Sequence, residues 1–195
     1  MYKIYQMKRV LIGTIIATVI FFGYQATMWM GGFHNDFCLY SGQQDTIMHS
    51  LNSAHLKDGL YMMPSCDPTV MKDHKQMEDA MKKNVGKPWA MIFYHTAMED
   101  MQAGSMIKGI MHVFFACLFV CLVLYNGSFS SFGSRFMVSM AFSLFALVLG
   151  PMNEMNWWGF PWGFIKTSVI DLTLGWAICS IWLAYYVKKK MPIAQ

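Results

Sequence analysis

Three polar side chains inside otherwise apolar segments are the residues of this chain best suited to chemistry in a membrane. Counted inward from one end of their segments, Gln25, His112 and Asp171 lie at a depth of about 9–12 Å, at about 1.5 Å per helical residue. Ionisable side chains at such depth normally face a partner or a watery cavity. The sequence therefore predicts one buried polar layer in which His112 pairs with Asp171 and Gln25 is a neutral third member.

Two interpretations fit this polar layer. A charge-assisted hydrogen bond between His112 and Asp171 would hold membrane helices together. Alternatively, the same pair would serve as a proton relay or as a site for a quinol-type headgroup. The three residues have no motif spacing that indicates a reaction, so we expect the structural role and keep the second as the alternative.

Methionine is unusually frequent, at 20 of 195 residues. Nine methionines lie between the first two apolar segments: Met48, Met62, Met63, Met71, Met77, Met81, Met91, Met98 and Met101. Thioethers combined with imidazoles suit Cu(I), which makes His95, Met98 and Met101 candidate ligands. Methionine is also an adaptable core filler, and these methionines are scattered. We therefore expect no cofactor and no metal site, with copper handling as the alternative.

Sequence motifs for catalysis are absent from this chain. It contains no H-E-x-x-H, C-x-x-C, C-x-x-C-H, P-loop or G-x-G-x-x-G pattern. Hydrolytic zinc, covalently attached haem and nucleotide chemistry therefore have no support. The sequence favours a protein that is not an enzyme.

The five cysteines divide into two groups. Cys117, Cys121 and Cys179 lie in apolar segments, where cysteine usually acts as a small packing residue. Cys38 and Cys66 are the only two in the polar insert. If that insert lies in an oxidising compartment they are candidates for a disulfide; the alternative is two unrelated thiols.

Four apolar segments must position these residues: 10–30, 106–125, 136–149 and 164–187. The connections on one side carry seven basic residues and no acid: Lys3, Lys8, Arg9, Arg135 and Lys188–Lys190. Ten of the eleven acids lie in the connections on the other side. Since basic loops remain in the cytoplasm, the pattern predicts a multi-pass protein of the bacterial inner membrane with both termini in the cytoplasm.

The formal net charge of +4 comes from this basic rim. Basic residues at this rim serve as signals for membrane insertion and attract anionic lipid, which explains the charge. We therefore expect the lipid bilayer and other membrane subunits as partners, and no nucleic acid.

The predicted fold class is an all-α membrane bundle of four transmembrane helices with a small α+β insert outside the cytoplasm. The predicted parts are residues 1–31 (tail and first span), 32–105 (insert) and 106–195 (three further spans and a basic tail). Within the insert, helical patterns at 45–56 and 70–83 alternate with strand patterns at 59–64 and 88–95. The third span, 136–149, has only fourteen residues, which is short for a hydrocarbon core of ~30 Å.

An aromatic loop precedes the fourth span. Trp157, Trp158 and Trp162 lie among glycines and a proline at the end of a span. Paired tryptophans in such a position are typical of the belt at a membrane–water interface.

Three short stretches carry a resemblance to a known group of proteins. Residues 8–13 at the first span, 58–64 in the insert, and 156–160 followed by Asp171 and Gly175 resemble a group of small bacterial inner-membrane proteins of unknown function. That resemblance brings no activity to transfer. The layout is also superficially similar to that of the claudins, but Tyr61 replaces their tryptophan and a second downstream cysteine is missing.

Taken together, these features predict a non-catalytic accessory or scaffold subunit of a larger inner-membrane complex, of the respiratory or transport type. The small size, the lack of catalytic motifs, the aromatic surface and the short third span favour it. The alternative is a protein that handles copper in its insert, or that moves protons or binds quinone at His112 and Asp171.

Overall fold

The computed structural model describes residues 2–67, 72–98, 100 and 102–188. The chain forms two compact units: residues 1–39 together with 101–195, and residues 40–100. We call them the helical unit and the insert unit. Residues 32–39, which the sequence analysis assigned to the insert, belong to the helical unit.

The helical unit contains four helical rods that are long and apolar enough to cross a membrane. Its elements are α1 (Tyr2–Met30), η1 (Asn35–Phe37), α4 (Gln102–Asn126), α5 (Phe132–Leu147), η3 (Val148–Met152), α6 (Asn153–Trp158), α7 (Trp162–Ile170), η4 (Asp171–Gly175) and α8 (Trp176–Tyr186). The chain is therefore a mostly helical, multi-pass membrane protein by length and composition of its helices. The prediction of four spans is confirmed at this level.

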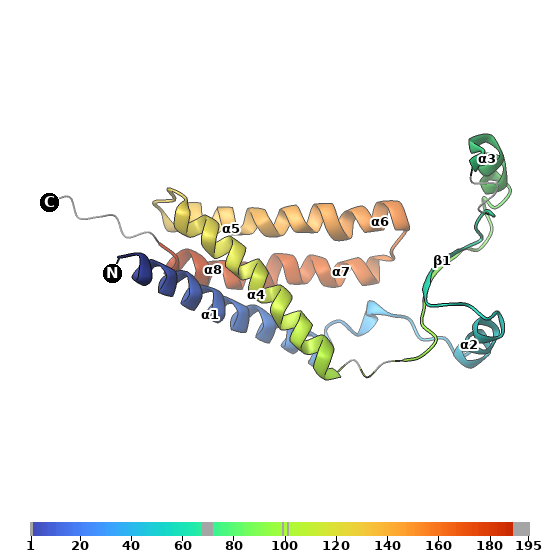
Figure 1. The fold of residues 1–195 in the computed structure, drawn as a ribbon, viewed down its shortest axis with the longest axis horizontal. Helices are drawn as coiled ribbons and strands as arrows, with labels where there is room; N and C mark the ends of the chain where they lie inside the picture. Colours follow the sequence, from blue (N-terminus) through green and yellow to red (C-terminus); the bar gives the residue numbers. More distant parts are fainter. Residues whose placement is uncertain (1, 68–71, 99, 101, 189–195) are drawn as a thin grey trace. The chain divides into compact units, whose positions relative to one another are not determined.

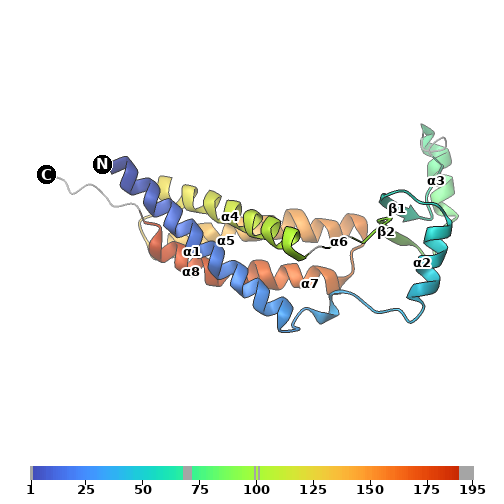
Figure 2. The same ribbon diagram turned by 60° about the horizontal axis from the view of Figure 1, so that its bottom comes forward.

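Two of the rods are built from several helical pieces (Figure 1). The third rod runs through α5, the π-helical turn η3 and α6, and the fourth runs through α7, the π-helical turn η4 and α8. These two rods lie side by side, while α1 packs against α4 and α8 (Figure 2). In both views α1 begins and α8 ends at the same end of the helical unit.

The third span is longer than the sequence suggested. It covers Phe132–Trp158, 27 residues, because the helix does not stop at Pro151. Pro151 lies within the π-helical turn η3, where the wider turn accommodates a residue that lacks an amide hydrogen. The expectation of a fourteen-residue span is wrong, and with it the argument that a short span must be covered by partner helices.

The core of the helical unit combines small side chains with local polar bonds. Ala17, Cys117 and Cys179 are fully buried where α1, α4 and α8 meet, and the Cys179 thiol donates to the carbonyl of Ala17 at 3.6 Å. Small residues allow helix backbones to approach closely in a membrane. The Ser139 and Ser180 hydroxyls lie 2.7 Å apart between the third and fourth rods.

Arg135 joins the third rod to the end of the fourth. Its Nε donates to the carbonyl of Ala184 near the end of α8 at 2.7 Å, and Nη1 donates to the carbonyls of Phe129 and Ser130 at 3.0 Å each. A cation beside the last carbonyls of a helix is favourable because of the helix dipole. The side chain is buried, so this arginine joins two spans in addition to adding a basic charge to the rim.

The insert unit contains α2 (Gln44–Ser53), β1 (Gly59–Met63), α3 (His74–Lys82) and β2 (Ala90–Tyr94). The strands pair antiparallel, with Gly59 opposite Tyr94 and Met63 opposite Ala90. Asp73 caps α3 by accepting from the amides of Lys75 and Gln76. The predicted order of helix, strand, helix and strand with two paired strands is confirmed.

An exposed contact between Asp58 and Thr96 lies at one end of the sheet. The Asp58 carboxylate accepts from the Thr96 hydroxyl at 2.7 Å and from the Thr96 amide at 2.9 Å. These two hydrogen bonds, the side-chain bond first, hold the pKa of Asp58 below its ordinary value. They join the residue before β1 to the residues after β2.

Candidate functional site: a buried carboxylate in the fourth span

The candidate site is built around Asp171, the first residue of the π-helical turn η4. The residue is buried at 7% exposure, which is unusual for an acid. π-helical turns within α-helices are frequent at functional sites. Because Asp171 lies within a membrane span, its environment decides whether it serves structure or chemistry.

Two side chains from the first span and the loop after it bind the Asp171 carboxylate. His34 Nε2 lies 3.1 Å from Oδ1, and the Gln25 amide donates to Oδ2 at 3.3 Å. The His34 side chain is fully buried. An ionised carboxylate only accepts hydrogen bonds, so this contact places the imidazole proton on Nε2. The pair joins the first span to the fourth.

Two further polar atoms lie buried on residues around this carboxylate. The Tyr24 hydroxyl and His34 Nδ1 have no hydrogen-bond partner among the described residues. The Tyr24 ring also occupies the space beside Gly175, where a Cβ atom would lie only 2.4 Å from the ring. The absence of a side chain at position 175 therefore allows α1 to approach η4.

The loop after α1 is attached to α7 as well. Asp36 in η1 forms an ion pair with Lys166, and the Phe37 and Phe164 rings lie 5.1 Å apart. The hydrogen bond from the Lys166 ammonium is the main reason that the pKa of Asp36 lies below its ordinary value. Gly163 permits this contact, because a Cβ there would lie 2.7 Å from the Asp36 carbonyl oxygen. We call the residues His34–Phe37 and their partners on the fourth rod the loop latch.

The structure brings together two of the three residues predicted for the polar layer. Gln25 and Asp171 are hydrogen-bonded, whereas His112 is exposed on α4 and His34 occupies the place expected for it. The prediction of a His112–Asp171 pair is therefore corrected. Depth along a helix gives the level of a residue but not its face: His112 precedes the buried Cys121 by nine residues, about two and a half turns, and so lies on the opposite face.

Sequence reasoning missed His34 because it lies beyond the end of the first span. The chain leaves α1 through Gly31 and Gly32, and Gly32 has a positive φ of 78°. This turn directs His34 back to the fourth rod. The two glycines are the only sequence signal for such a reversal.

The two cysteines considered for a disulfide are free thiols in the structure. Cys38 is exposed in the helical unit, and Cys66 is half-buried in the insert unit. Their pairing stays a prediction.

The aromatic residues of the last connection lie around a short turn. Trp157 and Trp158 end α6, Trp162 begins α7, and all three are exposed. Gly159, with a φ of 65°, ends α6 in the left-handed conformation typical of a helix C-terminus. The turn is thus shorter than the predicted loop, and the tryptophans stand on helix ends.

The weak copper candidates do not form a site in the described residues. His95 Nδ1 lies 3.7 Å from an Asp58 oxygen, Met98 is almost fully exposed, and Met101 lies outside the described residues. Among the described histidine, cysteine, aspartate and glutamate side chains, no group of three is arranged to hold a metal ion.

Comparison of the chain with protein-family models, with curated proteins and with solved structures finds no match.

Proposed function

We propose that this chain is a non-catalytic accessory or scaffold subunit of a larger complex in the bacterial inner membrane, of the respiratory or transport type. The observation that carries the proposal is the exposure of His112 within a membrane span. Ionisable side chains in spans normally face other protein or a water-filled cavity. In the described part of the chain no hydrogen bond or ion pair reaches the His112 imidazole.

The position of His112 makes this exposure informative. The second span begins at Gly104, so His112 lies about 12 Å into it at about 1.5 Å per residue. Lys108, one turn nearer the end, has a long flexible side chain that can extend to the interface. The shorter imidazole has less reach. Protein from another subunit would supply the polar partner that His112 lacks.

His112 also belongs to a regular stripe along α4. The exposed positions that follow the alternating spacing of three and four residues are Ser105, Lys108, His112, Phe115, Phe119 and Leu122. Residues with this spacing lie along one line of the helix, and such a line can pack against a second helix. The stripe is polar at its first three positions and apolar at its last three. A partner helix with polar residues at the first end and apolar residues at the other would fit it.

The buried cluster of Gln25, His34 and Asp171 has a structural role in this proposal. Gln25 and the loop latch join the end of the first span and the loop after it to the fourth rod. The alternative of a proton or quinone site at His112 and Asp171 loses its geometric basis, because the two side chains do not share a site.

Crosslinking from α4 tests the subunit proposal. With a photoreactive amino acid in place of His112, we expect adducts with a different polypeptide in intact membranes, since another subunit covers this face. The matched control is the same amino acid in place of Val19, which is 67% exposed on α1 and lies outside the stripe. Lipid adducts alone at position 112, or adducts only with a second copy of this chain, would contradict the proposal.

The orientation of the chain completes the proposal. The sorting of basic and acidic residues supports termini in the cytoplasm and an insert unit on the periplasmic side. In this orientation, the tryptophans at the ends of α6 and α7 lie at the outer interface.

Reporter fusions test this orientation. We expect a reporter fused after Gln195 to be active in the cytoplasm and one inserted near Lys72 to be active outside, because the basic residues of the rim resist translocation. Activity of both reporters on the same side of the membrane would exclude four spans with this orientation.

A further inference from the structure

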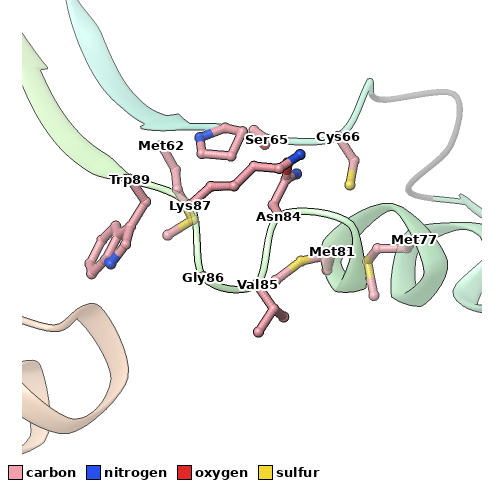
Figure 3. Close-up of a pocket in the computed structure, with 11 residues that line it drawn as sticks. Met62, Ser65, Cys66, Met77, Met81, Asn84, Val85, Gly86, Lys87 and Trp89 are labelled. Atoms are coloured by element: carbon pink, nitrogen blue, oxygen red, sulfur yellow. The ribbon is translucent and has the colours of Figure 1, made fainter.

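Four sulfur-containing side chains line one pocket of the insert unit (Figure 3). They are Met62, Cys66, Met77 and Met81, and the pocket has a volume of about 370 Å³. We propose that this pocket is a binding site for Cu(I), with the Cys66 thiolate and the methionine thioethers as ligands. This inference goes beyond the proposed accessory role and uses residues that the copper candidates at 95, 98 and 101 did not include.

The local fold brings these four side chains to one pocket, with the Lys87 side chain between Met62 and the other three (Figure 3). Met62 comes from β1, where it pairs with Met91 of β2, and Cys66 follows that strand by three residues. Met77 and Met81 lie one turn apart on α3, so both side chains project from the same face of the helix. Figure 3 shows them on the helix beside Cys66, with Met62 on the neighbouring strand.

The donor set selects for a soft monovalent ion. Thiolate and thioether ligands prefer Cu(I), whereas Mg²⁺ and Ca²⁺ require oxygen ligands. A structural Zn²⁺ site usually has four cysteine or histidine ligands, and this pocket has one cysteine. The lining residues include one thiol and three thioethers but neither a histidine nor an acid. Methionine thioethers are soft, neutral donors, which suit Cu(I) better than hard divalent ions.

The reaction on binding balances without an oxidant or a reductant. Cu⁺ replaces the proton of the Cys66 thiol to form a copper–thiolate bond, and the proton leaves to solvent. The thioethers donate electron pairs and remain neutral, so the bound centre carries no net charge. A neutral centre is compatible with Lys87, whose ammonium lines the same pocket.

The pocket is open to solvent. Val85 and Trp89, which line it beside the sulfurs, are 81% and 53% exposed. Methionine has three rotatable side-chain bonds, so thioethers around an open pocket can converge on one ion. Since Cys66 must be a thiolate, a disulfide between Cys66 and Cys38 would exclude copper from this site.

Competition for Cu(I) tests the proposal on the full chain in detergent. The reduced protein is titrated under anaerobic conditions against bicinchoninate, a chromogenic Cu(I) chelator. We expect one tight Cu(I) equivalent per chain. Met77→Leu and Met81→Leu should each weaken the affinity by about tenfold, and Cys66→Ser by more, because each removes one ligand while leucine preserves the apolar volume.

Matched variants distinguish this site from general sulfur chemistry. Met48→Leu changes an exposed methionine of α2 outside the pocket, and Cys38→Ser changes an exposed thiol outside it. Both variants should bind Cu(I) as the unchanged chain does. X-ray absorption of the loaded protein should show sulfur neighbours of copper. Failure to retain Cu(I), or equal loss in Met48→Leu and Met77→Leu, or unchanged affinity in both α3 variants would overturn the proposal.

Discussion

Replacing His34 with leucine is expected to destabilise the helical unit strongly. The substitution removes the imidazole from Asp171 and leaves the buried carboxyl with the Gln25 amide alone. Leaving a buried polar group without its hydrogen-bond partner typically costs about 1–3 kcal/mol of folding free energy, and more when the group is charged. The measurement is thermal unfolding of the purified protein in one detergent, followed by intrinsic tryptophan fluorescence.

His112→Leu is the matched control for this experiment. It makes the same change at a histidine that the structure leaves exposed, so the unfolding midpoint should shift little. Asp171→Leu should destabilise less than His34→Leu, because it leaves a neutral imidazole instead of a stranded acid. A larger effect at His112 than at His34 would show that the Asp171 carboxyl pairs with His112 and not with His34.

Gly175→Ala is expected to loosen the contact between the first span and η4. The new methyl group would lie 2.4 Å from Cε1 of the Tyr24 ring, closer than any normal contact. Because the ring packs within the bundle, the helices must shift, and overpacking of this kind costs about 1–3 kcal/mol. The same thermal measurement detects this loss.

A control and a rescue separate the contact from a general effect of losing glycine. Gly150→Ala changes a glycine in the other π-helical turn, where no atom lies within 4 Å of the new Cβ, and should leave stability nearly unchanged. Adding Tyr24→Ala to Gly175→Ala removes the clash, so the pair should be less destabilised than the sum of the two single variants. Full additivity would contradict the contact.

The elements of this fold were largely readable from residue patterns. Long apolar runs gave the four spans, and the alternation of helix and strand patterns gave the paired strands of the insert unit. The end of the third span was not readable, because Pro151 normally stops a helix. Here a π-helical turn absorbs it and the helix continues to Trp158.

The candidate site was predictable only in part. The depth of Gln25 and Asp171 within their spans was enough to place them at one level. The histidine that binds Asp171 could not be predicted in this way. His34 reaches Asp171 through a reversal of the chain at Gly32, and no periodicity extends across such a turn. The sulfur pocket was missed for a similar reason: Met62 and Met77 lie in different elements, and only the fold of the insert unit brings them to one pocket.

Purification of the tagged chain from its own membranes in a mild detergent tests the subunit proposal most directly. We expect the chain to elute with other membrane polypeptides in fixed proportion, at a mass well above the 22.4 kDa of one copy. We also expect His112→Phe to weaken this association while the isolated chain remains folded. Recovery of the chain alone, as a monomer or only with copies of itself, would contradict the account.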